Sequence, residues 1–165
     1  MINILKVKGR IDLWSLAAAV LISLSVGILS SFFTMDAESI YKSLTLPSFA
    51  PPPWIFGPVW TILYITMGIA SYRIWMYAGH NKGVGTALFY YTMQLILNFL
   101  WSVIFFSLQF RGFAFLEIIL LLVLIIVTTF RFFDIDKPAG LLMVPYLLWV
   151  SYASLLNGSI WIFNR

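Results

Sequence analysis

The sequence predicts an all-α integral membrane protein, a bundle of five transmembrane helices with a long, lid-like first loop. Of its 165 residues, 62% are hydrophobic and only 10% are charged, whereas about 25% of the residues in a soluble domain are charged. Five apolar stretches each hold about 20 or more residues, enough to cross a hydrocarbon layer of about 30 Å. A transmembrane barrel would alternate polar and apolar residues, and the run LLLVLIIVTTF does not. We therefore expect one membrane domain, residues 1–165, with spans at residues 13–33, 54–78, 84–108, 113–133 and 138–163.

The first span is followed by the longest connection in the chain. Asp12 is placed to cap the first helix, and the apolar run after it is too long for the hydrophobic region of a signal peptide. A short amphipathic segment at residues 36–44 comes next, and then residues 46–54, where three consecutive prolines keep the chain extended and stiff. Long ordered loops are usually lids or binding loops, so we expect this loop to cover a site.

The later spans are joined by short connections, so neighbouring spans should pack antiparallel. Pro58 and Pro138 fall in the first turns of spans two and five, where a proline costs little. Pro145 lies deeper in span five and predicts a kink or a loosened turn. The sequence leaves open whether that irregularity serves packing or a ligand.

The charged residues indicate topology rather than nucleic-acid binding. The basic residues lie singly at helix ends, with no cluster and no aromatic platform beside them, so the net charge of +4 does not indicate nucleic acid as a partner. Seven fall on one side of the predicted bundle: Lys6, Lys8, Arg10, Arg73, Lys82, Arg131 and Lys137. Three fall on the other: Lys42, Arg111 and Arg165. The positive-inside rule then predicts a cytoplasmic N-terminus and an outside C-terminus.

Several kinds of chemistry are excluded or disfavoured. The chain has no cysteine and a single histidine, His80, in the second loop, so we predict no metal site and no thiol chemistry. Arg73 and Arg131 lie near helix ends, where we expect them to snorkel outward, and Glu117 lies about one turn inside span four. Proton-coupled carriers place acidic residues or histidines along their pathway, and serine hydrolases need a general base. Both classes are therefore disfavoured.

Aromatic and amide side chains recur at helical spacing on three spans. On span three the row is Gln94, Asn98, Trp101 and Phe105; on span two it is Gly57, Trp60, Tyr64 and Gly68; on span five it is Tyr146, Trp149, Ala153 and Asn157. Amides buried in hydrocarbon need partners, which either join helices or orient a ligand, and the sequence leaves both readings open. Together the rows predict a mostly apolar pocket with a few polar groups, suited to a flat hydrophobic molecule. On span one, Ser23, Gly27 and Ser31 form a small-residue row that indicates close helix packing.

Three segments carry a resemblance to a known family. PPPWIFGPVWTILYITMGIA at 51–70, QLILNFLWSVIFF at 94–106 and VPYLLWVSYASLLN at 144–157 resemble the translocator proteins, also called tryptophan-rich sensory proteins or peripheral benzodiazepine receptors. The resemblance, to bacterial-type members, implies a five-helix bundle in the cell membrane, often a homodimer, with a pocket opening toward the first loop. It implies binding of protoporphyrin IX or a related tetrapyrrole, of sterols in animals and of isoquinoline carboxamides, with no required cofactor.

The resemblance also implies particular pocket residues. By motif they are Pro47, Phe49, Trp60, Tyr64, Asn98, Trp101, Trp149 and Ala153. Many bacterial members have tryptophan where this chain has Phe49, and that tryptophan is one of two implicated in porphyrin breakdown; Trp149 matches the other and is the one catalytic candidate. The animal sterol pattern after span five is absent at 157–161.

Three functional hypotheses follow. The first is a membrane receptor or binding protein for a planar hydrophobic ligand, in particular a porphyrin, with Asn98 and Trp149 orienting it. The second is a transporter of such ligands, which requires a second opening on the N-terminal side; the sequence shows no broken helix pair of the kind that marks alternating access. The third is an enzyme that photo-oxidises bound porphyrin through Trp149.

Overall fold

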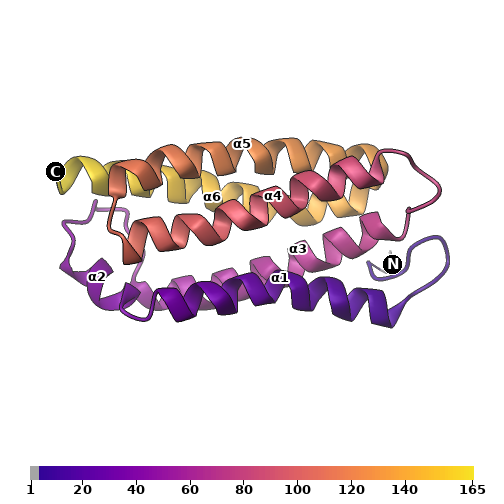
Figure 1. The fold of residues 1–165 in the computed structure, drawn as a ribbon, viewed down its shortest axis with the longest axis horizontal. Helices are drawn as coiled ribbons and strands as arrows, with labels where there is room; N and C mark the ends of the chain where they lie inside the picture. Colours follow the sequence, from indigo (N-terminus) through magenta and orange to yellow (C-terminus); the bar gives the residue numbers. More distant parts are fainter. Residues whose placement is uncertain (1–3) are drawn as a thin grey trace.

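The computed structural model describes residues 4–165 and confirms an all-α architecture with five helices long and apolar enough to cross a membrane (Figure 1). The helices are α1 (Leu13–Phe33), α2 (Ala37–Ser43), η1 (Pro53–Ile55), α3 (Phe56–Trp75), α4 (Val84–Ser102), η2 (Val103–Ser107), α5 (Arg111–Ile135) and α6 (Lys137–Phe163). The short η1 is a 3-10 turn that leads into α3. η2 is a stretch of π-helix that continues α4. The membrane-spanning helices are therefore α1, α3, α4, α5 and α6.

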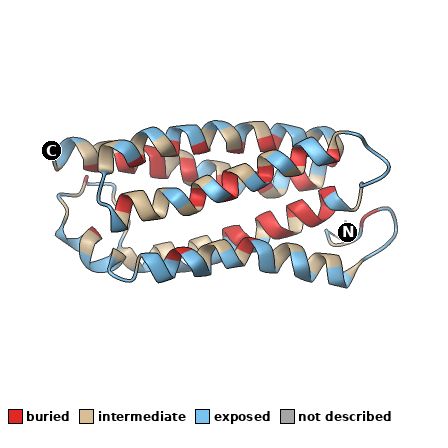
Figure 2. Ribbon diagram, viewed as in Figure 1, coloured by how far each residue is buried: buried red, intermediate tan, exposed pale blue. Residues whose placement is uncertain are grey.

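The five long helices form a closed ring in which one seam is weak. α1 packs on α3, α3 on α6, α6 on α5, and α5 on α4. The ring closes between α4 and α1, where contacts are sparsest among the five neighbouring pairs. Figure 2 shows the consequence: buried residues follow the inward faces of the other helices, whereas α1 is mostly exposed and buries only Ser23 and Ser30. The exposed apolar side chains of α1 lie on the surface that a bilayer would cover.

Two aspartates cap helices as N-cap residues. The Asp12 carboxylate accepts hydrogen bonds from the backbone amides of Trp14 and Ser15 at 3.1 and 3.2 Å, which confirms the cap expected from the sequence. Hydrogen bonds from the Ser15 side chain and backbone lower the pKa of Asp12, so the carboxylate stays charged. At the start of α6, Asp136 accepts from the backbone amide of Ala139 at 3.1 Å.

A buried ion pair closes the end of the bundle at which the N-terminal segment lies. Arg73 was expected to snorkel, and that expectation is wrong: its side chain is 5% exposed and forms a two-pronged pair with Asp136, Nε to Oδ2 at 2.6 Å and Nη2 to Oδ1 at 3.1 Å. Its remaining nitrogen, Nη1, donates to the carbonyls of Ile4 and Lys6. The pair therefore links α3, the start of α6 and the segment that precedes α1.

Candidate functional site

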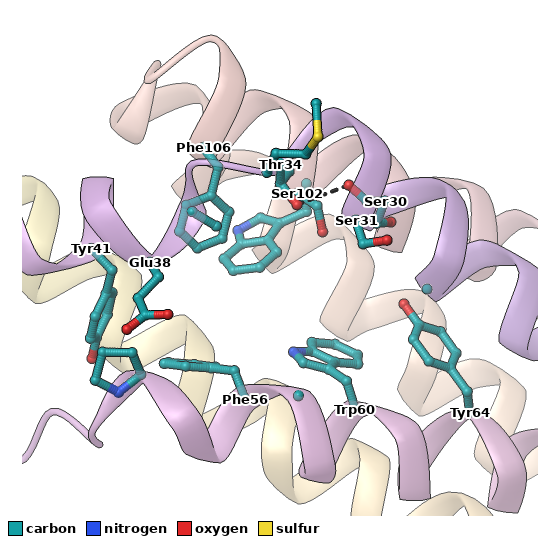
Figure 3. A pocket seen from close by; sticks show the side chains of 16 residues that line it. Ser30, Ser31, Thr34, Glu38, Tyr41, Phe56, Trp60, Tyr64, Ser102 and Phe106 are labelled. Carbon is teal, nitrogen blue, oxygen red and sulfur yellow. Dashed lines mark hydrogen bonds between the residues drawn. The ribbon is translucent and has the colours of Figure 1, made fainter.

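A pocket of about 370 Å³ lies at the opposite end, between α1, α2, α3 and the α4–η2 helix (Figure 3). It is lined by Gly27, Ser30, Ser31, Thr34, Met35, Ala37, Glu38, Tyr41, Pro53, Phe56, Gly57, Trp60, Tyr64, Trp101, Ser102 and Phe106. Its size falls within the range of about 300–1,000 Å³ that is typical of small-molecule sites. Most of its exposed wall is apolar, and five of the lining residues are aromatic rings of Phe, Trp and Tyr on α3, α4 and η2.

One wall of the pocket is a row of aromatic side chains on α3. Phe56, Trp60 and Tyr64 follow at intervals of four residues, which places them on one helix face. The Trp60 and Tyr64 rings stack at 5.6 Å between centroids with an interplanar angle of 29°. Gly27 of α1 makes room for this wall, because a Cβ there would lie 2.5 Å from the Tyr64 ring.

The opposite wall comes from the end of α4 and from η2. Trp101 stacks on Phe105 at 5.3 Å, and its indole N–H donates to the Asn157 side chain of α6 at 3.0 Å. Phe106 lies within the π-helical turn Val103–Ser107. π-Helix occurs mostly as single turns within α-helices, frequently at functional sites. Here the π-helical turn places the Phe106 ring in the pocket wall.

A second, much smaller cavity adjoins the pocket. It has a volume of about 20 Å³ and shares Tyr41, Phe56, Trp101 and Phe106 with the larger pocket. Ala153 of α6 lines this cavity and not the pocket itself. The structure therefore brings Ala153 close to Trp101, in the small cavity beside the pocket rather than in the pocket lining.

Asn98 lies behind the pocket wall rather than in it. Its side chain is 1% exposed and accepts a hydrogen bond from the Tyr64 hydroxyl. Its amide nitrogen donates to the Tyr146 hydroxyl at 3.3 Å, and that hydroxyl donates to Gln94 at 2.8 Å. Gln94 and Asn98, which the sequence allows either to join helices or to orient a ligand, thus join α3, α4 and α6. Asn98 reaches the pocket only through Tyr64.

Trp149 lies outside the pocket, against the neighbouring face of α3. Its ring packs against Phe56 at 6.0 Å and against Tyr152 at 5.6 Å. It lines a shallow, open hollow between α3 and α6 that shares no lining residue with the pocket. The resemblance implies that the Trp149 ring lies in the pocket. In the structure, the Phe56 side chain lies between this ring and the pocket.

Residues 45–49 of the first loop lie along α6, whereas other parts of the same loop, with Glu38, Tyr41 and Pro53, line the pocket. Pro47 is buried and Phe49 is 48% exposed, and neither lines the pocket. The Tyr152 hydroxyl donates to the Phe49 carbonyl at 2.8 Å, and Thr45 exchanges backbone hydrogen bonds with the Asn164 side chain at 2.9 and 3.0 Å. The helix α2, which precedes these prolines, supplies the residues at the pocket mouth.

Two residues of α2 define this mouth. Glu38 is exposed and pairs with Lys42 at 2.6 Å. Tyr41 is buried, with its hydroxyl donating to the Pro51 carbonyl at 3.0 Å. Burial, with a smaller contribution from a charge on Tyr152, raises the pKa of Tyr41 to about 12. Tyr41 thus remains a neutral hydrogen-bond donor that holds α2 to the proline segment.

The sequence did not reveal the contribution of α1 to the site. Gly27, Ser30, Ser31 and Thr34 follow at intervals of three, one and three residues and line the pocket. The available signal was the row of small residues on this span, which was interpreted only as helix packing. Within residues 4–165, the buried Ser30 hydroxyl has no hydrogen-bond partner. No hydrogen bond from the Trp60 indole is found in that range either, and Figure 3 shows its nitrogen directed into the pocket.

The groups that line the pocket are suited to stacking and hydrogen bonding. Across the described part of the chain, no group of three or more His, Asp or Glu residues is placed to hold a metal ion. Glu38, the only carboxylate among the described residues that line the pocket, is exposed and paired with Lys42. The remaining groups are flat rings, small hydroxyls and an indole N–H, which are able to stack on a flat molecule and to hydrogen-bond its polar edge.

The fold and this site define the class: a helical integral membrane protein with a ligand-sized, aromatic pocket between its helices at one end. The model of the TspO/MBR family matches residues 18–162. The tryptophan-rich protein TspO of Chlorobaculum tepidum is 41% identical over 147 residues, 88% of this chain and 93% of the relative. The translocator protein of Homo sapiens is 34% identical over 140 residues, 84% of this chain and 83% of the relative. The chain belongs to the TspO/MBR family, which confirms the resemblance seen in its motifs.

A third relative, which carries a different name, is similar over much of the chain. The tryptophan-rich sensory protein of Cereibacter sphaeroides is 36% identical over 123 residues, which cover 74% of this chain and 75% of the relative. The relatives thus carry names of sensory proteins and translocators. These names describe the relatives and leave the ligand of this chain to be argued from its own pocket.

Proposed function

We propose that this protein is a membrane receptor for a planar hydrophobic ligand of the porphyrin class, bound in the pocket between α1, α2, α3 and α4–η2. The observation that carries the proposal is the composition of this pocket: aromatic rings on two facing walls, with Trp60 and Tyr64 on one and Trp101 on the other. Aromatic walls favour flat ligands, because they bury large areas with little loss of side-chain freedom. Drug-like isoquinoline carboxamides share this flat apolar shape and belong to the same proposal.

Two donors give the ligand an orientation. The buried Ser30 hydroxyl lacks a hydrogen-bond partner within residues 4–165, and a buried polar group without a partner costs about 1–3 kcal/mol. The Trp60 indole nitrogen is directed into the pocket beside it. A carbonyl or carboxylate at the edge of a ligand would satisfy both. Asn98 acts through Tyr64, whose ring it fixes by a hydrogen bond, and is therefore a positioning residue in this proposal.

Protoporphyrin IX titrated into the purified protein tests the proposal, with tryptophan quenching and porphyrin absorbance as independent readouts. Ser30→Ala removes one donor and should weaken binding about fivefold or more, as expected for an uncompensated hydrogen bond. Trp60→Leu removes the stacking ring and should weaken it about tenfold or more. Trp75→Leu is the matched control, since Trp75 lies at the opposite end of α3 outside the pocket. Equal affinities of Trp60→Leu and Trp75→Leu proteins would refute the proposed site.

The closed opposite end supports a receptor over a transporter. Transport requires a second opening on the N-terminal side, and the Arg73–Asp136 pair ties that end together. Porphyrin photo-oxidation through Trp149 has less support than binding, because Phe56 separates that indole from the pocket. The proposal keeps the bacterial cell membrane, a cytoplasmic N-terminus and a homodimer as further expectations. No resident cofactor is part of it.

A further inference from the structure

A second hollow of about 370 Å³ lies in the other half of the bundle, on the same α1–α4 seam. Its lining comes from α1, α3 and α4: Ser15, Ala18, Ala19, Ile22, Ser71, Trp75, Leu88, Tyr91 and Thr92. It shares no lining residue with the porphyrin pocket. Between the two hollows, the Ser23 and Tyr91 hydroxyls meet at 2.6 Å and Gly27 contacts the Tyr64 ring. The seam is thus divided into two separate sites.

The second hollow differs from the first in its polar groups. Its serine and threonine hydroxyls donate within the protein: Ser15 to Asp12 at 2.7 Å, Ser71 to Gly68 at 3.0 Å and Thr92 to Leu88 at 3.0 Å. The Tyr91 hydroxyl is bonded to Ser23. With its donors occupied and its walls formed by alanine, isoleucine, leucine and tryptophan, the hollow offers little to a polar ligand. It suits a hydrocarbon chain.

The hollow opens toward the surface that lipid covers. Ala18 and Ile22 of α1 are exposed, and Trp75 at the end of α3 is 56% exposed. Exposed apolar side chains on a membrane-spanning helix face acyl chains. A chain from the surrounding bilayer can therefore enter the hollow from the side, without passing through the protein.

A rigid basic turn lies at the same end of the bundle. Val7 and Arg10 exchange backbone hydrogen bonds at 2.9 Å in both directions, and Lys8 and Gly9 between them have φ of 48° and 80°. Positive φ at both central residues is the geometry of a type I′ turn. Val7 is 1% exposed and anchors the turn. Its basic side chains, together with that of Lys6, are exposed.

The turn is held next to the hollow by the chain on both sides. It leads through Asp12 into α1, whose first turn carries Ser15 of the hollow. The Lys8 ammonium lies over the Tyr77 ring, 4.6 Å from its centroid, two residues after Trp75 of the hollow. Asp12 opposes an anion here, but its carboxylate is occupied by Trp14 and Ser15. Three basic side chains against this one carboxylate leave the mouth positive.

We infer that this hollow and the basic turn form a binding site for an anionic phospholipid. One acyl chain fills the α1–α3–α4 hollow, and the phosphate lies against Lys6, Lys8 and Arg10. Basic residues near a membrane surface attract anionic headgroups, and the hollow supplies the apolar anchor that makes the contact specific to a lipid rather than to a soluble phosphate. Binding here also holds the N-terminal segment against α3 and α6.

Binding of phosphatidylglycerol and phosphatidylcholine with identical acyl chains, measured by native mass spectrometry of the detergent-purified full chain, tests the inference. The wild type should prefer phosphatidylglycerol about fivefold or more, the factor expected of roughly one basic contact at a membrane surface. The triple variant Lys6→Gln, Lys8→Gln, Arg10→Gln should lose this preference. The matched control Lys42→Gln, Arg165→Gln, which removes basic residues of the other end, should keep it. Equal binding of the two lipids by the wild type, or a preference that survives in the triple variant, overturns the site.

A second pair of variants tests the hollow itself. Ala18→Phe fills the hollow and should lower binding of both lipids, whereas Ala17→Phe, on exposed surface outside the lining, should not. Thermal unfolding and protoporphyrin titration of both variants control for folding. Displacement of the lipid by glycerol phosphate at similar concentrations would show a site for soluble phosphate and overturn the lipid assignment. Because the two hollows share no residue, loss of lipid preference with porphyrin affinity unchanged separates this inference from the proposed function.

Discussion

The two ends of this bundle use polar groups in opposite ways. At the end closed by the N-terminal segment, Arg73 and Asp136 are buried and fully engaged with each other and with backbone groups. At the α2 end, Ser30 is buried without a partner within residues 4–165, and it faces a pocket. Buried polar groups are normally satisfied, so an exception needs a reason. The comparison thus separates an end whose buried polar groups are paired from an end that leaves the Ser30 hydroxyl available to the ligand proposed above.

Breaking the charge pair at the closed end should have the largest effect on stability. Asp136→Asn keeps a side-chain acceptor for the helix cap but leaves the Arg73 guanidinium buried without its counter-charge, which should cost about 3 kcal/mol or more. Glu38→Gln is the control at the other end, because it breaks an exposed pair worth about 0.5 kcal/mol or less. Thermal unfolding in detergent should show a large loss for the first variant and almost none for the second. Similar losses in both would contradict the contrast between the ends.

Two glycines that sit on α3 and α1 should respond differently to the same substitution. A Cβ at Gly68 would lie 2.6 Å from the Val20 Cα, a backbone atom that cannot move aside without separating α1 from α3. Gly68→Ala should therefore cost about 1–3 kcal/mol of folding free energy. A Cβ at Gly27 would instead meet the Tyr64 ring, a side chain that can shift without separating the helices, although the shift strains its hydrogen bond to Asn98.

Gly27→Ala should consequently cost less stability than Gly68→Ala but weaken porphyrin binding, because moving the Tyr64 ring alters the pocket wall. Unfolding temperature and protoporphyrin affinity, measured on both variants, separate the two effects. A Gly27→Ala protein that binds as the wild type does, while losing as much stability as Gly68→Ala, would show that Tyr64 plays no part in the site.

The contrast between Asn98 and Trp149 tests the position of the site on α3. Asn98→Leu leaves the hydroxyls of Tyr64 and Tyr146 without one partner each, which should weaken porphyrin binding by about 1–2 kcal/mol through a displaced Tyr64 ring. Trp149→Phe keeps the contact with Phe56 outside the pocket, and the affinity should change by less than about 0.4 kcal/mol. Protoporphyrin titration checks both. A larger loss in Trp149→Phe than in Asn98→Leu would place the ligand between α3 and α6.

The fold was predictable because length and apolarity alone select five helical spans. Trp60 and Tyr64 were also predictable as a pair, since their four-residue spacing fixes their common face whatever the tertiary structure. The direction of the Trp149 ring was not, because it depends on packing against Phe56 and Tyr152. The ring lines the hollow between α3 and α6, whereas Ala153, one helical turn further on, lines the small cavity beside the pocket.

Contacts between distant residues account for the other differences. Arg73 is buried because it pairs with Asp136 at the start of α6. The local sequence of α3 contains no residue that predicts this partner. The π-turn at Val103–Ser107 has no proline or glycine to signal it. On α1, small residues serve both close packing and a pocket wall, so Gly27 and Ser31 could be recognised as lining residues only once Tyr64 and Trp101 were placed opposite them.

The smallest expected effect concerns Tyr41 and the hold of α2 on the pocket mouth. Its pKa is raised to about 12 in the folded protein, against about 10 for an unperturbed tyrosine, because burial favours the neutral phenol. The stability that Tyr41 contributes is therefore complete below pH 10 and is lost as the pH rises through about 12. The difference in unfolding temperature between wild type and Tyr41→Phe should be constant from pH 7 to about 9.5 and should shrink above pH 10. If the difference instead grows with pH, the Tyr41 hydroxyl is not a buried donor to Pro51, and α2 is held at the pocket mouth by other contacts.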